Sequence, residues 1–202
     1  MPQPLQPRAP LPGLSKQRVY RIINADAVID PGYQFDYYDG GGLDVAFLGL
    51  AQTDAHGNVN VSKFSGRPVG CGGFINITQN AKEVVFCGAF TAGGLRVEAK
   101  DGRLVILKEG RERKFLQQVE QITFSGHYAA KVGQPVLYVT ERAVFRLTSD
   151  GLELLEVAPG IDIERDVLAH MDFRPIMRDV KLMEAGLFQE KWGGLAACLG
   201  GH

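Results

Sequence analysis

The chain has 202 residues, of which 45% are hydrophobic and 22% are charged, and this composition excludes a disordered or collagen-like chain. At about 150 residues per domain, the length predicts one α/β unit with tails. Twenty-two basic and 23 acidic residues give a formal net charge of −1. Since this charge creates no overall field, we expect neither nucleic acid nor a membrane as a partner.

Cysteine usage argues against disulfide scaffolds and zinc modules. The three cysteines form no C-x-x-C pair, and only four histidines accompany them, so we expect no metal site. The first twelve residues contain five prolines in place of an apolar leader, and no run approaches the roughly 18 apolar residues that span a bilayer. These features predict a cytoplasmic protein. The cysteines are Cys71, Cys87 and Cys198.

Residues 1–23 are expected to form a flexible, proline-rich lead, because closely spaced prolines favour polyproline II over helix or sheet. Several basic residues precede the first acid, Asp26, and they form either a solvated arm or a docking segment. The domain proper is predicted to cover residues 24–189. Residues 190–202 are rich in glycine and are predicted to be a frayed tail.

The next segments predict a buried parallel sheet. Residues 33–42, YQFDYYDGGG, indicate a short helix or turn that glycines close. The apolar run at residues 43–50 favours a strand buried on both faces of a parallel sheet, and residues 83–90 form a second such run. Cys87 lies in this second run and is expected to be a buried apolar cysteine.

Between these runs the pattern changes three times. Residues 56–64 alternate and predict a turn and a strand, residues 66–73 form a glycine-rich loop, and residues 74–82 predict a helix. The order of strand, glycine-rich loop, helix and strand is typical of a parallel α/β unit.

The second half has an antiparallel character. Residues 95–110 predict a hairpin around Asp101 and Gly102, and residues 135–157 contain further strands with a turn at residues 149–151. Helical spacing at residues 161–173 predicts a helix with Asp162 near its start as a cap.

The glycine-rich loop is the strongest candidate for chemistry. Clustered glycines ahead of a helix let a ligand approach backbone N–H groups, so Gly70, Cys71, Gly72 and Gly73 form either an anion or oxyanion site or a tight turn. The loop matches neither the dinucleotide nor the P-loop pattern. Residues 40–42 leave the same choice between a ligand loop and a helix C-cap.

Other polar residues leave alternatives open. Cys71 is either a nucleophile activated by the helix N-terminus or an inert thiol. His127 is a general base or a surface residue, and His56 fits a turn. Asn58 and Asn60 either brace the loops of a site or form Asx turns. No G-x-S-x-G pattern supports serine hydrolase chemistry.

Three stretches carry a family resemblance. They are FDYYDGGGLDVAFLGLAQTDAHGNVNVSKF, RPVGCGGFINITQNAKEVVFCGAFTAGGL and VAPGIDIERDVLAHMDFRPI. Together they resemble the C-terminal, β-type half of the acetate/propionate CoA-transferases, which belong to the glutamate-dependent ketoacid CoA-transferase family. The resemblance implies a three-layer α/β/α fold, similar to ribose-5-phosphate isomerase, with a largely parallel sheet and antiparallel hairpins.

The resemblance also implies a reaction. In the family, a glutamate carboxylate attacks an acyl-CoA thioester, and CoA passes through an enzyme thioester to a second carboxylic acid. Acyl-CoA and short carboxylic acids are therefore the expected ligands. We expect no cofactor, because coenzyme A enters as part of the thioester substrate. By the same resemblance, Gly72 and Gly73 offer backbone N–H groups to the oxyanion. The residues implied to line the substrate site are Asp39, Gly40, Gly41, Gly42, Gly70 and Cys71.

The chain departs from the family at the nucleophile. The family's Glu-x-Gly motif lies before the matching segment, whereas the first glutamate here is Glu83. We therefore expect the isolated chain to be inactive. Three explanations remain open: a fragment, a subunit that pairs with an α-type half or forms a homo-oligomer, or a degenerate homologue. The alternative is a non-catalytic module of the same fold that binds acyl-CoA or a carboxylate.

Overall fold

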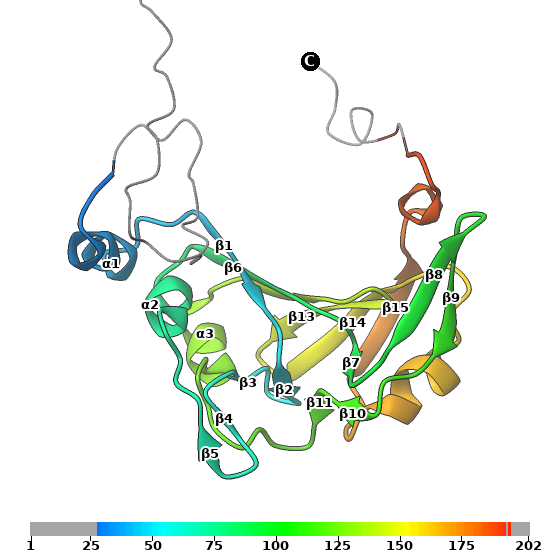
Figure 1. Cartoon of the computed structure of the whole chain (residues 1–202), viewed down its shortest axis with the longest axis horizontal. Helices are drawn as coiled ribbons and strands as arrows, with labels where there is room; N and C mark the ends of the chain where they lie inside the picture. Colours follow the sequence, from blue (N-terminus) through cyan, green and yellow to red (C-terminus); the bar gives the residue numbers. More distant parts are fainter. Residues whose placement is uncertain (1–27, 193, 195–202) are drawn as a thin grey trace, which may run out of the picture. The chain divides into compact units, whose positions relative to one another are not determined.

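The computed structural model describes residues 28–192 and 194, and its helices and strands lie within residues 31–188. A six-stranded sheet forms the centre, with the strand order β1-β6-β12-β13-β14-β15 (Figure 1). Its strands are β1 (Val45–Gly49), β6 (Glu83–Cys87), β12 (Val136–Val139), β13 (Ala143–Thr148), β14 (Gly151–Val157) and β15 (Ile176–Leu182).

The sheet is mixed in direction. Strands β1, β6 and β12 are parallel, β13 is antiparallel to both β12 and β14, and β14 is parallel to β15. The chain therefore belongs to the α/β class, as the sequence predicts, with the parallel strands β1, β6 and β12 followed by the antiparallel hairpin strands β13 and β14.

Helices are short and follow the predicted breaks. The α-helices are α1 (Pro31–Asp39), α2 (Phe74–Gln79) and α3 (Gly126–Val132). Helix α2 connects β1 to the parallel strand β6, and α2 and α3 lie on the same side of the sheet in Figure 1. Among the helices of the described residues, none is long and apolar enough to cross a membrane.

The predicted helix at residues 161–173 consists of a π-helical turn, η1 (Ile163–Val167), and a 3-10 turn, η2 (Leu168–His170). Asp162 caps it as predicted, since its side chain accepts a hydrogen bond of 2.8 Å from the Arg165 N–H. A further 3-10 turn, η3 (Ala185–Phe188), follows β15. The predicted lead at residues 1–23 lies outside the described residues, as does most of the predicted tail.

Small sheets surround the central one. They are β2 (Gln52–Asp54) with β3 (Val59–Asn60) and β11 (Phe115–Leu116); β4 (Lys63–Phe64) with β5 (Arg67–Pro68); β7 (Thr91–Ala92) with β10 (Glu112–Arg113); and β8 (Arg96–Lys100) with β9 (Arg103–Lys108). The β8–β9 hairpin confirms the prediction, because Asp101 and Gly102 take the positive φ values of 52° and 73° that its tight turn requires.

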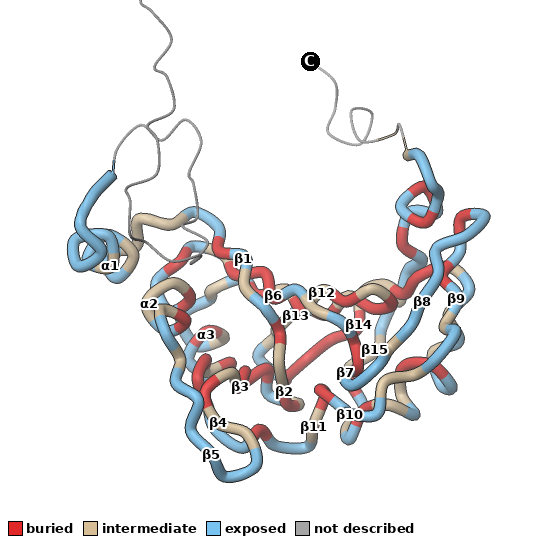
Figure 2. Tube along the Cα trace, viewed as in Figure 1, coloured by how far each residue is buried: buried red, intermediate tan, exposed pale blue. Residues whose placement is uncertain are grey.

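The main core lies on the side of the sheet that α2 and α3 cover. Phe86 of β6 is completely buried, and its ring lies 5.1 to 5.7 Å from the rings of Phe74, Phe124 and Tyr138. Strand β14 is buried over most of its length (Figure 2). A second, smaller cluster joins Leu104, Ala158, Met183 and Phe188.

Two burial predictions are wrong for the same reason. The apolar run at residues 43–50 predicts a strand buried on both faces, but β1 is the edge strand, and the side chains of Val45 and Phe47 are 41% and 72% exposed. Cys87 is also exposed rather than buried. The β1–β6 register pairs Gly49 with Cys87, so Cys87 projects from the same face as Phe47. An apolar run identifies a strand but does not show which of its faces the rest of the chain covers.

Candidate active site

The glycine-rich loop leads into α2 with an unusual backbone. Gly70 and Gly72 have positive φ values of 85° and 53°, and a Cβ at either position would meet no atom within 4 Å. Gly73 is different, because a Cβ there would lie 2.7 Å from the Phe35 ring of α1. The loop thus needs glycine at residues 70 and 72 for conformation and at residue 73 for close packing.

The loop presents backbone donors at the start of a helix. The N–H groups of Val69 and Gly70 donate to the Ser62 carbonyl, and Phe74 N–H donates to the Cys71 carbonyl. Within residues 28–192, no acceptor pairs with the N–H groups of Gly72 and Gly73, and no side chain caps α2. Unpaired donors at a helix start are the kind of group that stabilises an oxyanion.

The second predicted set, residues 39–42, ends α1 and contacts α2. The Asp39 carboxylate accepts hydrogen bonds of 2.9 and 3.2 Å from Asn76 Nδ2, and its carbonyl accepts one of 2.7 Å from Asn80 Nδ2. The Gly40, Gly41 and Gly42 N–H groups donate to carbonyls of α1, as in a helix C-cap. Helix α2 therefore brings both predicted sets together, the loop at its start and the glycine turn along its side.

The other candidates take structural positions. Cys71 is half-buried and packs against the main core, whereas His127 is exposed in the first turn of α3. His56 lies in a turn, where its N–H donates to Asp54 Oδ1 at 3.0 Å. Asp54 is 2% exposed and also accepts from the Asn58 N–H and Nδ2, both at 3.1 Å. Asn58 Oδ1 in turn accepts from Gly126 N–H, which ties this turn to α3.

Asn60 also braces a loop. Its Nδ2 donates to Gln52 Oε1 at 2.7 Å and to the Lys63 carbonyl at 2.6 Å, while its Oδ1 accepts from the Ser62 and Lys63 N–H groups. Ser62 is the residue whose carbonyl holds Val69 and Gly70, so Asn60 supports the glycine-rich loop through one intermediate residue.

A buried charge cluster that the sequence pattern does not predict lies around the turn between β12 and β13. Arg142, in the turn between β12 and β13, is completely buried and donates to Glu109 at 2.7 and 3.1 Å and to Glu141 at 2.7 Å. Its guanidinium carbon lies 4.9 Å from the centre of the Phe90 ring. Burial acts to raise the pKa of Glu109, but hydrogen bonds from Arg142 and Thr91 outweigh it and hold that pKa below its ordinary value.

The same cluster holds the segment after β6. Lys114 is 7% exposed and its Nζ donates to the Ala89 carbonyl at 2.7 Å, while Glu141 Oε2 accepts from the Phe90 N–H at 2.8 Å. Burial lowers the pKa of Lys114, and the nearby Glu141 carboxylate opposes that shift. The one signal in the sequence is Glu141 next to Arg142 between two apolar strands, which a surface turn explains equally well.

A cavity of about 210 Å³ opens between α2 and α3. Ile75, two residues beyond Gly73, lies in its wall, as do Thr78, Phe124 and Tyr128. Helix α2 therefore has the glycine-rich loop at one end and this mostly apolar hollow along its side.

The curated relatives that match this chain are named as CoA-transferases. No protein-family model matches the chain. The chain is 56% identical over 183 residues to a caffeate CoA-transferase of Acetobacterium woodii, covering 88% of this chain and 35% of the relative. It is 36% identical over 110 residues to a 3-oxoadipate CoA-transferase subunit of Pseudomonas knackmussii, covering 51% of this chain and 35% of that subunit.

A solved structure supports the same relationship. The acyl-CoA transferase YdiF of Escherichia coli O157:H7, in a structure described as a thioester complex with CoA, superposes with a TM-score of 0.83 at 49% identity. The superposition covers 86% of this chain and 34% of YdiF. This chain thus spans about one third of the length of the relatives it matches.

Proposed function

Because this chain is a homologue of about one third of a CoA-transferase, we propose that it is a β-type CoA-transferase domain or subunit. The observation that carries the proposal is the 56% identity to the Acetobacterium woodii enzyme across 88% of the chain. The proposed substrates are short acyl-CoA thioesters and small carboxylic acids, with no further cofactor. The proposed location is the cytoplasm, a reducing compartment, which suits the free thiols of Cys71 and Cys87.

The proposed role of this chain is to stabilise the oxyanion. A glutamate carboxylate attacks the thioester carbonyl, and the carbonyl oxygen becomes negatively charged beside the N–H groups of Gly72 and Gly73. The C–S bond then breaks, leaving a mixed anhydride and CoA thiolate. The thiolate attacks the glutamyl carbonyl of the anhydride, which releases the first acid and leaves an enzyme-CoA thioester. The acceptor carboxylate then attacks this thioester, and the same two steps in reverse release the acceptor's CoA thioester and the free glutamate.

The glutamate is proposed to come from a complementary polypeptide. The first glutamate of the chain, Glu83, begins β6 and pairs with Val45 in the sheet, rather than preceding the segment that matches the family. Asp39 and residues 40–42, with Gly70 and Cys71, are proposed to line the site around α2. Their support is the pair of hydrogen bonds from Asn76 and the one from Asn80 that fix Asp39 on this helix.

The test is a reconstitution assay. The full chain is mixed with a polypeptide comprising the part of the Acetobacterium woodii relative that this chain does not match, and transfer of CoA from propionyl-CoA to labelled acetate is measured. We expect no transfer by either component alone and transfer by the mixture. Tight CoA binding by this chain without transfer in any mixture would contradict the proposal and support a non-catalytic binding module.

A matched pair of variants tests the oxyanion role. Gly66 lies in the turn between β4 and β5, and Gly72 in the loop that follows β5; both have positive φ, and a Cβ at either meets nothing within 4 Å. Gly72→Ala strains the proposed donor and is expected to reduce the reconstituted rate by about 100-fold, the usual effect of losing one oxyanion donor. Gly66→Ala introduces the same kind of strain and is expected to keep the rate within about twofold. Equal losses in the two variants would contradict the assignment.

A further inference from the structure

Among the described residues, one face of the central sheet carries apolar side chains on its parallel strands that no helix covers. We call it the open face and define it by Val45 and Phe47 of β1, Val85 and Cys87 of β6, and Leu137 and Val139 of β12. Val45, Phe47 and Cys87 are exposed, Leu137 and Val139 are half-buried, and Val85 between them is 8% exposed. The registers place these side chains together, since Phe47 pairs with Val85 and Val85 with Leu137, while Cys87 pairs with Val139. Phe47 is 72% exposed, which is unusual for a phenylalanine in a strand of a parallel sheet.

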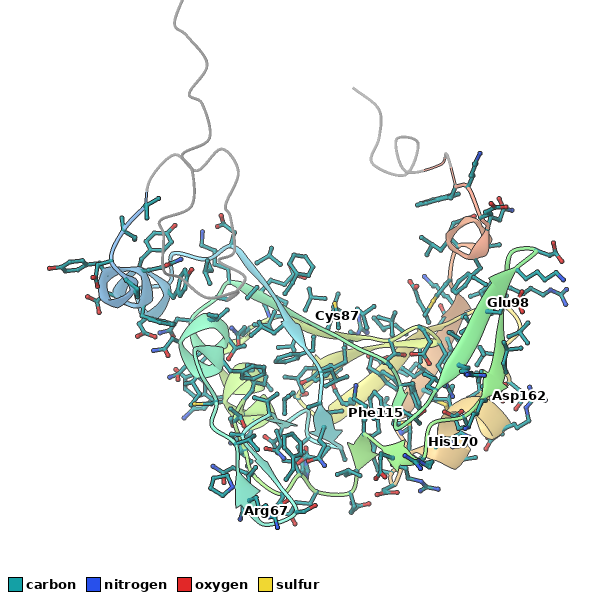
Figure 3. All side chains as sticks on the ribbon, viewed as in Figure 1. Arg67, Cys87, Glu98, Phe115, Asp162 and His170 are labelled. Atoms are coloured by element: carbon teal, nitrogen blue, oxygen red, sulfur yellow. The ribbon has the colours of Figure 1, made fainter. Side chains whose placement is uncertain are left out.

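The opposite face of the sheet is covered by helices, whereas the open face has none among the described residues. Helices α2 and α3 both lie on the core side of the sheet (Figure 1), and Figure 3 shows Cys87 projecting from the side away from them. Parallel strands are normally covered by helices on both faces, because crossover connections place helices there. The described residues therefore supply one of the two helical layers over β1, β6 and β12.

The open face has the anatomy of a protein interface. On the next strands of the same face, β13 and β14, charged residues follow the apolar ones: Leu137 pairs with Arg146, and Arg146 pairs with Glu153. Arg146 Nε lies 2.7 Å from Glu153 Oε2, and Arg178 Nη1 lies 3.7 Å from Glu153 Oε1. An apolar centre with a charged rim is typical of a docking surface.

We propose that the open face binds the complementary CoA-transferase polypeptide, with an apolar helix face of that polypeptide packed on Val45 and Phe47. This inference rests on the proposed function. The occupant is argued from length and architecture: the relatives are about three times as long as the matched segment, and the layer missing from this face is helical. The Pseudomonas knackmussii relative is itself named as one subunit of its enzyme.

The experiment measures association separately from catalysis. Analytical ultracentrifugation follows binding of the full chain to the unmatched part of the Acetobacterium woodii relative, for the wild type and two variants. Phe47→Glu places a charge at the 72% exposed phenylalanine of the open face, and Leu107→Glu places one on the β9 strand of a different sheet, where Leu107 is 61% exposed. Circular dichroism checks that both variants fold.

We expect Phe47→Glu to weaken association by about tenfold or more, and Leu107→Glu to leave it unchanged. Equal binding by the two variants would overturn the inference. So would a wild-type dimer of this chain that Phe47→Glu dissociates, because a second copy would then occupy the face. If transfer is restored but does not depend on Phe47, the proposed function stands and the docking face is wrong. If association depends on Phe47 but no transfer is restored, the docking face stands and the proposed function is wrong.

Discussion

The two faces of the central sheet use the same strands for opposite purposes. On the core face, Phe86 lies among three other rings and is completely buried. On the open face of the neighbouring strand, Phe47 is 72% exposed. Because side chains alternate along a strand, one apolar run can supply both a core and an interface. Residue type alone therefore does not distinguish a residue that stabilises this chain from one that serves a partner.

The largest expected effect is on the free energy of unfolding, which should fall much more on substitution of Phe86 than of Phe47. Phe86→Ala removes a buried ring and leaves a cavity, so it should lower the free energy of unfolding by about 3–5 kcal/mol. Phe47→Ala should change it by less than about 0.5 kcal/mol, because the ring is already in solvent. Urea denaturation followed by circular dichroism measures both. A loss of several kcal/mol in Phe47→Ala would show that the open face is covered within the isolated chain.

A second pair of variants compares buried with exposed charge. Arg142→Met leaves the carboxylates of Glu109 and Glu141 without their buried partner, and removing one member of a buried ion pair costs about 3–5 kcal/mol. Arg178→Met removes a 60% exposed arginine from the rim of the open face, where ion pairs contribute about 0–1 kcal/mol. Urea midpoints measure both, and similar losses would mean that the rim is structural.

Much of this architecture could be predicted from local chemistry. The Asp101–Gly102 turn, the parallel strands around α2 and the Asp162 cap each depend on residues close together in the chain. Clustered glycines predict exposed backbone donors at Gly72 and Gly73, and no acceptor among the described residues uses their N–H groups.

The failures concern contacts between distant segments. Burial of Cys87 depends on which elements cover the sheet, and an apolar run carries no information about that. The partners of Arg142 include Glu109, 33 positions away, so periodicity within one segment could not reveal the cluster. Asn76 and Asn80, which join Asp39 to α2, have the sequence pattern of ordinary polar positions in a short helix.

Acid should weaken the charged cluster before it affects the apolar core. Burial acts to raise the pKa of Glu109, but hydrogen bonds from Arg142 and Thr91 keep it below its ordinary value of 4.5. Asp166 of η1 adjoins this cluster, because its carbonyl accepts a hydrogen bond of 2.9 Å from Arg142, and the hydrogen bond from Arg165 keeps the pKa of its carboxyl below 3.8. A carboxylate with a lowered pKa stabilises the fold above its unfolded pKa, and this contribution is lost as the pH falls through its folded pKa. The free energy of unfolding should therefore decrease below about pH 4.5.

Urea titrations between about pH 3 and pH 7 measure this loss, and Glu109→Gln provides the control. Because a glutamine amide does not titrate in this range, the variant should be less stable at neutral pH but should show a shallower decrease at acid pH. An unchanged slope in the variant would mean that other carboxylates account for the acid sensitivity.

The smallest expected effect concerns Cys87 and returns to the open face. Its exposed thiol contributes little to folding, so Cys87→Ser should change the free energy of unfolding by less than about 0.5 kcal/mol. The same substitution should remove one rapidly reacting thiol in labelling with Ellman's reagent, whereas Cys71→Ser, at a half-buried position packed on the core, should not. Slow labelling at Cys87 in the isolated chain would mean that the open face is covered, and the comparison between the two faces would then fail at this position.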